Sequence, residues 1–227
     1  WDLPRQRSVL STSVEPILCD PNAALVAANI TPSGVPVITV AVGRVVHSFL
    51  YHSDMRCWMR VADQDFGSSD FSSIGVGSSE LGLLAQVQAA AATSNVQREF
   101  APNLLAPSVA ERRSIVTMRH VEHQLSCALL LSSPREYMYW LRAYTKLLVK
   151  EDRADRLRAL CDNLLGPPRA MTASHADGEV TAGQSSPFVM PALSRRSLLE
   201  RDVLPILRKD RRFQRLVNEV DARLASA

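Results

Sequence analysis

The sequence predicts an α+β fold in which antiparallel strands come first and an α-helical bundle follows. Two observations carry this prediction. Residues 1–63 hold short runs of β-branched and aromatic residues separated by turn residues, whereas apolar residues recur at helical spacing from residue 108 onward. With 227 residues, of which 46% are hydrophobic, the chain is long enough to bury a sizeable core.

The β-rich segment, residues 1–63, is expected to form part of a propeller-like blade. Strand-forming residues dominate "VPVITV" (35–40), "RVVHSFLY" (44–51) and "CWMRV" (57–61). The opening Trp1-Asp2 pair fits this interpretation, because such a pair often closes the third strand of a blade. A single blade leaves sheet edges open, so these strands must pair with further chain or pack on the helices.

Residues 64–107 are expected to be a loop-rich connector that contains one helix. Ser and Gly dominate its first part, and "LLAQVQAAAA" (83–92) has high helix propensity. The stretch "GVGSSELG" (75–82) resembles both a dinucleotide-binding loop and a nucleophile elbow. Its glycines and serines miss the spacing of both motifs, so we interpret it as a loop.

Three helices joined by short turns are predicted for residues 108–166, packed as antiparallel neighbours. Residues 108–111 form a capping box, and "SPRE" (133–136) supplies an N-cap Ser, a Pro at the first helical position and a Glu at the third. Asp152 is expected to cap the third helix, and "GPP" (166–168) to end it. The predicted core faces are formed by Ile115, Met118, Val121, Leu125, Cys127 or Ala128, Leu129, Tyr137, Trp140, Leu141, Tyr144, Leu147, Leu148, Leu157, Leu160, Cys161 and Leu164.

Residues 167–193 are small, polar and without periodicity, which predicts a flexible linker. Residues 194–227 are expected to form a C-terminal helical pair. Ser194 begins its first helix, and Pro205 forces either a break or a new first turn. The last helix directs one apolar face inward, formed by Phe213, Leu216, Val217, Val220 and Leu224.

Composition narrows the class of protein. The chain has 26 basic and 23 acidic residues, a net charge of +3 that is too small to indicate a nucleic-acid binder. The sequence contains no run of 18 apolar residues and no signal peptide, which argues against membrane insertion and secretion. Because the chain begins with Trp rather than Met, we interpret it as a piece of a longer protein. Four widely spaced cysteines are interpreted as small buried hydrophobic residues, typical of an intracellular protein: Cys19, Cys57, Cys127 and Cys161.

No catalytic, cofactor-binding or metal-binding constellation is found in the sequence. His120 and Glu122 match the first half of a zinc-deaminase signature, but the Pro-Cys-x-x-Cys half is absent, so Glu122 and His123 are placed on a polar helix face. The aromatic residues Tyr137 and Trp140 lie at helical spacing and are assigned to the core. We therefore predict a protein that is not an enzyme and carries no cofactor.

A cluster of four arginines near the carboxyl end is the strongest candidate for a charged binding surface. On a helical projection, Arg208, Arg211, Arg212 and Arg215 fall within about 100° of one another. Asp210 is a candidate cap for this helix, and Arg215, Glu219 and Arg223 stand at the i, i+4 spacing of ion pairs. Two interpretations stay open: a solvated face over a packed helix, or a surface for an acidic partner or nucleic acid.

Two stretches of the helical part carry a specific pattern: "LLERDVLPILRKDRRFQRLVNEV" (198–220), with its Arg-Phe-Gln-Arg-Leu run, and "EYMYWLRAYTKLLVKEDRADRLRALCDNLLGP" (136–167). They resemble the C-terminal domain of the HIRA family of histone-chaperone subunits. The initial "WDL", the run "GVPVITV" (34–40) and "CWMRVAD" (57–63) are similar to the front of that domain. Residues 64–110 and 169–191 match poorly, so nothing is transferred to them.

This resemblance implies a nuclear scaffold in a complex that deposits a replacement histone variant independently of replication. In that family the C-terminal region self-associates as a trimer and holds a large helical-repeat partner subunit, while contact with histones is indirect. Trp1 and Asp2 match a Trp-Asp pair of the family and are expected to help form the self-association contact. A nucleic-acid-binding module that uses the four arginines is the alternative.

Overall fold

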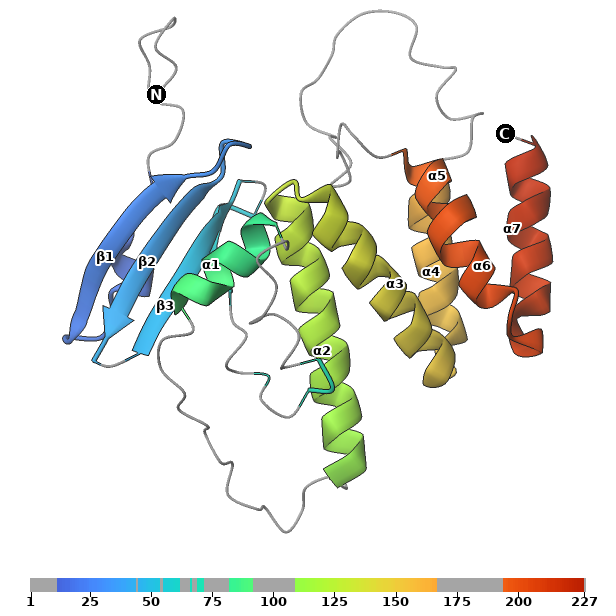
Figure 1. Ribbon diagram of the computed structural model, residues 1–227, viewed down its shortest axis with the longest axis horizontal. Helices are drawn as coiled ribbons and strands as arrows, with labels where there is room; N and C mark the ends of the chain where they lie inside the picture. The colour runs from blue at the N-terminus through green and yellow to red at the C-terminus, as the bar shows by residue number, and fades with distance from the viewer. Residues whose placement is uncertain are drawn as a thin grey trace, which may run out of the picture.

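The computed structural model describes residues 12–43, 45–53, 55–61, 66, 69–71, 82–91, 109–166 and 194–226. Within these ranges a four-stranded antiparallel sheet is followed by helices, which confirms the predicted α+β class. Figure 1 shows the sheet at one end of the molecule and the helices in a row that leads away from it toward the carboxyl end. The predicted linker and the Trp1-Asp2 pair lie outside the described residues.

The sheet is a meander in which each strand pairs with the next along the chain. Its order is β1-β2-β3-β4, so β1 and β4 form its edges. The sequence predicted the last three strands but did not single out β1, whose sequence "AALVAANI" is rich in alanine. The strands are β1 (Ala23–Ile30), β2 (Pro36–Val42), β3 (Val45–His52) and β4 (Cys57–Val61), and the 3₁₀ turn η2 (Glu15–Ile17) precedes them.

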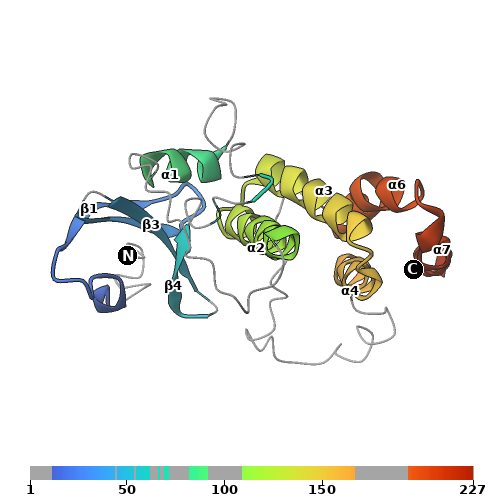
Figure 2. The ribbon, with the colours of Figure 1, turned by 90° about the horizontal axis from the view of Figure 1, so that it is seen from below.

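One face of the sheet belongs to the same core as the helices. Val37, Leu50 and Val61 on that face are buried together with helical residues. Helix α1 (Leu83–Ala91) lies beside the sheet, as Figure 2 shows from below. Its Val87 carbonyl oxygen accepts a hydrogen bond of 3.4 Å from Ser48 Oγ of β3. Helix α1 therefore joins the sheet to the helical part of the molecule.

Helices α2 (Val109–Leu130), α3 (Pro134–Lys150) and α4 (Ala154–Leu165) run alternately up and down in Figure 1. They match the three predicted helices, and short turns connect them as expected. The predicted core residues of α3 and α4 are buried except Tyr144, which is half-buried. In α2 the prediction is wrong for Ile115, which is 45% exposed because it lies in the part of α2 that neither the sheet nor α3 covers. Because Tyr137 and Trp140 are buried, the aromatic residues do serve as core.

The helix ends confirm some predicted signals and correct others. Gly166 has a φ of +76° and terminates α4 as expected. Asp152 does not cap α4, because it adopts a left-handed φ of +54° in the turn that ends α3, where the N–H of Arg153 bonds to the Leu148 carbonyl. Arg153 is the N-cap residue of α4 instead, and its side chain makes no capping bond.

Glu136 stabilises a different helix from the one that the sequence predicted. Its buried carboxylate accepts hydrogen bonds from the backbone N–H of Leu84 at 3.0 Å and of Ala85 at 2.9 Å. It thus caps α1, while Ser133 precedes α3 without a capping bond. Gly82 leaves room for this contact, since a Cβ there would lie 2.8 Å from Ser133 Oγ.

The carboxyl-terminal part is helical from residue 195, with a non-helical turn at 208–210. Ser194 precedes its first turn as predicted, and Pro205 stands in the first turn of α6, one of the two expected outcomes. The turn η6 and helix α7 bury the predicted apolar residues against the rest of the helices. The elements are α5 (Arg195–Leu198), the π-helix η5 (Leu199–Val203), α6 (Leu204–Leu207), the 3₁₀ turn η6 (Arg211–Phe213) and α7 (Gln214–Ser226).

The cysteines divide between two environments. Cys127 and Cys161 are buried as predicted, but the prediction is wrong for Cys19 and Cys57, which are exposed. Cys57 begins an edge strand and Cys19 lies in the turn before β1, and neither place is covered by the core. None of the described helices is long and apolar enough to cross a membrane.

Candidate protein-interaction surfaces

The four arginines lie at the junction between the last helices. Arg208 follows α6, Arg211 and Arg212 form most of η6, and Arg215 belongs to the first turn of α7. All four arginines are exposed. The helix projection used for the prediction treated them as one continuous helix, whereas the turn at Asp210 interrupts it.

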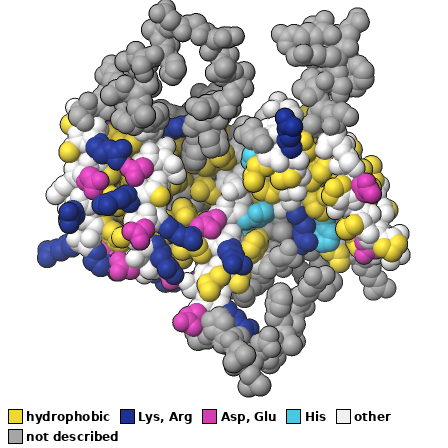
Figure 3. Space-filling model, turned by 180° about the vertical axis from the view of Figure 1, so that it is seen from behind, with side chains coloured by type: hydrophobic (Ala, Val, Ile, Leu, Met, Phe, Trp, Pro, Cys, Tyr) yellow, Lys and Arg dark blue, Asp and Glu magenta, His cyan; other side chains and the backbone are white. Residues whose placement is uncertain are grey.

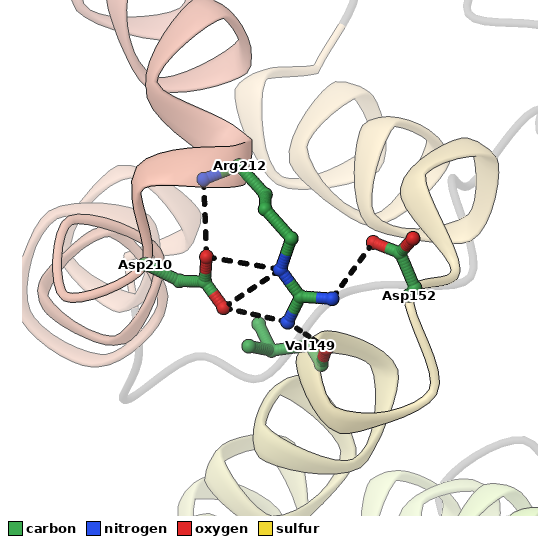
Figure 4. Close-up of polar contacts among 4 residues, drawn as sticks. All are labelled: Val149, Asp152, Asp210 and Arg212. Carbon is green, nitrogen blue, oxygen red and sulfur yellow. Dashed lines mark hydrogen bonds and ion pairs between the residues drawn. The ribbon is translucent and has the colours of Figure 1, made fainter.

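Arg212 makes the densest set of contacts, drawn in Figure 4. Its Nη2 lies 2.7 Å from Asp210 Oδ2 and donates a 3.2 Å hydrogen bond to the Val149 carbonyl, while Nη1 lies 3.3 Å from Asp152 Oδ1. Asp210 also accepts a 3.0 Å bond from the Arg212 backbone N–H, which confirms it as the cap of η6. Hydrogen bonds from Arg212 lower the pKa of Asp210, and Asp210 in turn raises the pKa of Arg212. Arg212 therefore ties η6 to the α3–α4 turn.

Helix α7 is held to its neighbours by further ion pairs. Arg208 Nη2 lies 2.8 Å from Asp221 Oδ1, and Arg158 of α4 contacts Glu219 Oε2 at 2.9 Å. Arg223 pairs with Asp162 of α4. The predicted Arg215–Glu219–Arg223 pairing along one face thus gives way to pairing across helices, because α4 lies within reach of α7.

The four arginines differ in whether they are paired. Within the described part of the chain, Arg211 and Arg215 have no ion-pair partner, whereas Arg208 and Arg212 are paired with aspartates. Figure 3 shows Lys and Arg intermixed with Asp and Glu over the helical end of the molecule, on the left in that view. This mixture favours the interpretation as a solvated face over packed helices.

A second surface, which the sequence interpretation missed, lies on β1. Three large apolar side chains on this strand are exposed: Leu25 by 53%, Val26 by 59% and Ile30 by 72%. Strand β1 is an edge strand and carries no charged residue and no proline. The uncharged run "AALVAANI" was a signal that could have identified it, but its alanines concealed the strand. We call Leu25, Val26 and Ile30, with the open edge of β1, the β1 surface.

The histidine-containing stretch of α2 has a structural role. His120 is buried, with Nδ1 2.8 Å from Ser69 Oγ and Nε2 3.0 Å from Gln124 Nε2, and the Phe66 ring stacks on it at 4.8 Å. Glu122, half-buried, accepts a 3.0 Å bond from the Tyr144 hydroxyl. No group of three or more metal-ligating side chains is present among the described residues.

The chain can now be compared with known proteins. The Hira family model, described as "TUP1-like enhancer of split", matches residues 1–164. The chain belongs to the Hira family. Relatives named "Protein HIRA" include those of Oryza sativa subsp. japonica, 30% identical over 96% of this chain, and of Homo sapiens, 31% identical over 99%.

A solved structure extends the Hira assignment from sequence to fold. A crystal structure of HIRA(644-1017) is similar with a TM-score of 0.65 and 28% identity, over 99% of this chain and 62% of that one. The predicted likeness to the C-terminal domain of the HIRA family is thereby confirmed. The chain spans only about a fifth of the Oryza and human relatives, 22% and 21% of their lengths.

Proposed function

We propose that this region of a Hira family protein is a non-catalytic scaffold within a histone chaperone complex. In this proposal it acts in the nucleus, in replication-independent chromatin assembly, by self-associating as a trimer and holding a large partner subunit. Histones are reached indirectly through the rest of the complex. The observation that carries the proposal is the Hira family match over residues 1–164, together with a similar fold over 99% of the chain.

The surfaces of the molecule support assembly rather than chemistry. At the helical end, ion pairs hold the helices to one another. On the β1 surface, apolar side chains are exposed and available to contact another polypeptide. A trimer that carries three tethered chaperone arms would raise their effective concentration at one site without any new contact to histones. Scaffolding would therefore act through multivalency.

Measuring the oligomeric state tests this proposal. Sedimentation or light scattering on the purified chain is expected to give about three times its mass of 25.0 kDa. A monomer whose mass does not change with concentration would overturn the scaffold proposal.

The contact assigned to Trp1 and Asp2 needs a variant of its own. Trp1→Ala with Asp2→Ala is expected to yield a monomer that keeps its helical circular dichroism spectrum. Arg5→Ala with Gln6→Ala, from the same segment, is the matched control and should leave the trimer intact. A double Trp1/Asp2 variant that stays trimeric would remove these two residues from the proposed contact.

Nucleic-acid binding remains the alternative, and only Arg211 and Arg215 favour it, because they lack ion-pair partners in the described structure. If this alternative holds, affinity for duplex DNA should fall with a log–log salt slope of about −0.9 for each neutralised phosphate. Arg211→Glu with Arg215→Glu should then abolish binding, while Arg208→Glu removes an arginine already paired with Asp221. Absence of DNA binding at low salt dismisses the alternative.

A further inference from the structure

The exposed face of α3 carries charges of one sign. Its exposed residues stand three or four positions apart, so they form one stripe along the helix. The acidic residue of α3, Glu136, is buried and caps α1. We call the exposed residues the α3 stripe, in which four residues are basic and the fifth is a tyrosine: Arg135, Tyr139, Arg142, Lys146 and Lys150.

Helices α4 and α7 expose charges of both signs instead. Asp155 and Asp162 stand beside exposed arginines on α4, and Arg158 of α4 pairs with Glu219 of α7. Asp162 pairs with Arg223 of α7. On these helices the charges neutralise one another within the chain. Helix α3 therefore differs from its neighbours in the composition of its exposed face.

Little negative charge borders the α3 stripe. In Figure 2, α1 and α6 lie along the same side of the molecule as α3, and neither helix contains a charged residue. Arg142 pairs with the buried Asp202 of η5 at 2.5 Å. Within the described part of the chain, the other three cations of the stripe have no ion-pair partner: Arg135, Lys146 and Lys150.

This arrangement of charge lowers the stability of α3. Arg142, Lys146 and Lys150 stand at i, i+4 spacing, where two like charges destabilise a helix. Arg135 lies in the first turn of α3, where the helix dipole disfavours a cation. A face that served only solubility would be more stable with glutamate at some of these positions. The stripe therefore indicates that a partner compensates its charge.

The chain itself offers no strongly acidic segment for the α3 stripe. Each range outside the described residues contains at most two acidic residues. The longest of these ranges, 167–193, has Asp177 and Glu179 against Arg169. One or two carboxylates do not match a stripe of four cations. The compensating charge is thus expected from another molecule.

Tyr139 favours a polypeptide over a nucleic acid as that molecule. Its side chain stands within the stripe and is 39% exposed, while its ring packs edge-on against Trp140 at 5.2 Å between centroids. Tyrosine and arginine are the residues that protein partners most often bury at their contacts. Affinity for nucleic acid depends instead on the number of neutralised phosphates, and the stripe has only three unpaired cations to offer.

The spacing of the cations selects the form of the partner. Side chains three or four residues apart on a helix lie about 5–6 Å from one another, and acidic side chains on a second helix repeat at the same distance. We propose that the α3 stripe binds an acidic helical segment of a partner polypeptide, with Tyr139 as its aromatic contact. The proposal rests on the proposed function only for the presence of a partner subunit.

A designed peptide tests the charge requirement. The probe is a fluorescein-labelled helical peptide of roughly 15–20 residues with glutamate at every third or fourth position. Lys146→Glu with Lys150→Glu is expected to weaken its binding about tenfold or more, because attractions become repulsions. Arg211→Glu with Arg215→Glu makes the same change of charge elsewhere and should weaken binding less than about twofold. Equal losses in the two double variants would overturn the proposal.

Two further probes separate helix recognition from general attraction to negative charge. The same peptide with glutamine in place of glutamate should not bind measurably. A short DNA duplex should bind more weakly than the acidic peptide at the same salt concentration. Tighter binding of the duplex, lost in the double lysine variant, assigns the stripe to nucleic acid and contradicts the proposal.

Stability provides a readout that separates binding from a structural role. Lys146→Glu places a carboxylate at i, i+4 spacing from both Arg142 and Lys150, so it should raise the denaturation midpoint while it weakens peptide binding. Lys146→Gln should give intermediate values in both measurements. If Lys146→Glu lowers the midpoint together with the affinity, Lys146 serves the fold and the proposal fails.

A photoreactive benzophenone side chain at position 139 of the full-length protein, in its purified complex, identifies the occupant. A cross-link to a segment of a different polypeptide that is rich in Asp and Glu supports the proposal. A cross-link to nucleic acid, to a second copy or to a segment without excess acid overturns it, as does the absence of any product. The oligomeric mass is measured separately, so a failed trimer and a failed α3 stripe are distinguishable outcomes.

Discussion

The helical end and the sheet end of this molecule differ in the side chains that their surfaces expose. At the helical end, charged side chains pair across elements, as Arg158 does with Glu219 and Arg212 with Asp152. At the sheet end, β1 carries no charge and exposes Leu25 and Ile30. Figure 3 shows the same contrast, with charges crowded over the helices and larger apolar areas toward the sheet.

This difference indicates where a scaffold of this kind should meet other polypeptides. Charged groups that already have partners within the chain gain little from a new partner, because exposed ion pairs contribute weakly and existing ones must first be broken. Exposed apolar side chains and open backbone groups gain much more from being covered. We therefore expect contacts with other polypeptides at the sheet end rather than at the ion-paired surface of the helical end.

Thiol labelling gives the largest expected contrast between the two ends. Burial raises the pKa of Cys127 and of Cys161 to about 12, from an ordinary value of 9.0. At pH 8 their reactive thiolate fraction should thus be about a thousandfold below that of an ordinary thiol. Cys19 and Cys57 at the sheet end are exposed and should label rapidly. Mass spectrometry of the alkylated native protein checks this, and all four should label once the protein is unfolded.

Truncating a leucine to alanine is expected to lower the free energy of unfolding by several kcal/mol more at the helical end than at the sheet end. Leu148→Ala in α3 removes a fully buried side chain and should lower the free energy of unfolding by about 2–5 kcal/mol. Leu25→Ala in β1 should lower it by about 0.5 kcal/mol or less in this chain, because 53% of that residue is exposed. Chemical denaturation provides both values. A large cost for Leu25→Ala would show that β1 is already covered within these residues.

A smaller loss of stability is expected when the contact between the ends, the cap that Glu136 provides to α1, is weakened. Glu136→Gln keeps the size of the side chain but replaces one of the two acceptors of the α1 cap with an amide donor. We expect a loss of about 1–3 kcal/mol in the free energy of unfolding. The matched control is Glu200→Gln, which alters an exposed ion pair with Arg196 and should have little effect. Equal denaturation midpoints for the two variants would contradict the capping role.

The smallest effect is expected at the exposed Asp210–Arg212 pair. Because Arg212 lowers the pKa of Asp210, the folded state gains stability above the ordinary pKa of an aspartate and loses it as pH falls through the lowered value. Nuclear magnetic resonance titration should therefore show the Asp210 pKa rising in Arg212→Ala. Arg211→Ala, from the adjacent position, should leave it unchanged.

Much of the fold could be predicted from local patterns. The strands β2, β3 and β4 follow runs of strand-forming residues, and α3 and α4 follow apolar residues at helical spacing with a glycine at the end of α4. Strand β1 could not be found in this way, because alanine favours helix and only its pairing with β2 keeps it extended. Tertiary context overrides propensity there.

The remaining errors share a different cause, which is competition from distant partners. Glu136 was expected to act within its own helix, but the N–H groups of α1 compete for its carboxylate. Asp152 was expected to cap α4, but it ends α3 and faces Arg212. The pairing of Arg212 was missed likewise, since its partner Asp152 lies in the α3–α4 turn, which a single-helix projection leaves out.

The cap that Glu136 provides has a consequence for the order in which this protein folds. Its partners Leu84 and Ala85 stand 52 and 51 residues away, so the contact closes a long loop, whereas α2 and α3 meet through a short turn. Loop closure costs more entropy than local helix pairing, and distant contacts form late. Glu136 is expected to show a φ-value near zero, with α1 docking last and detaching first.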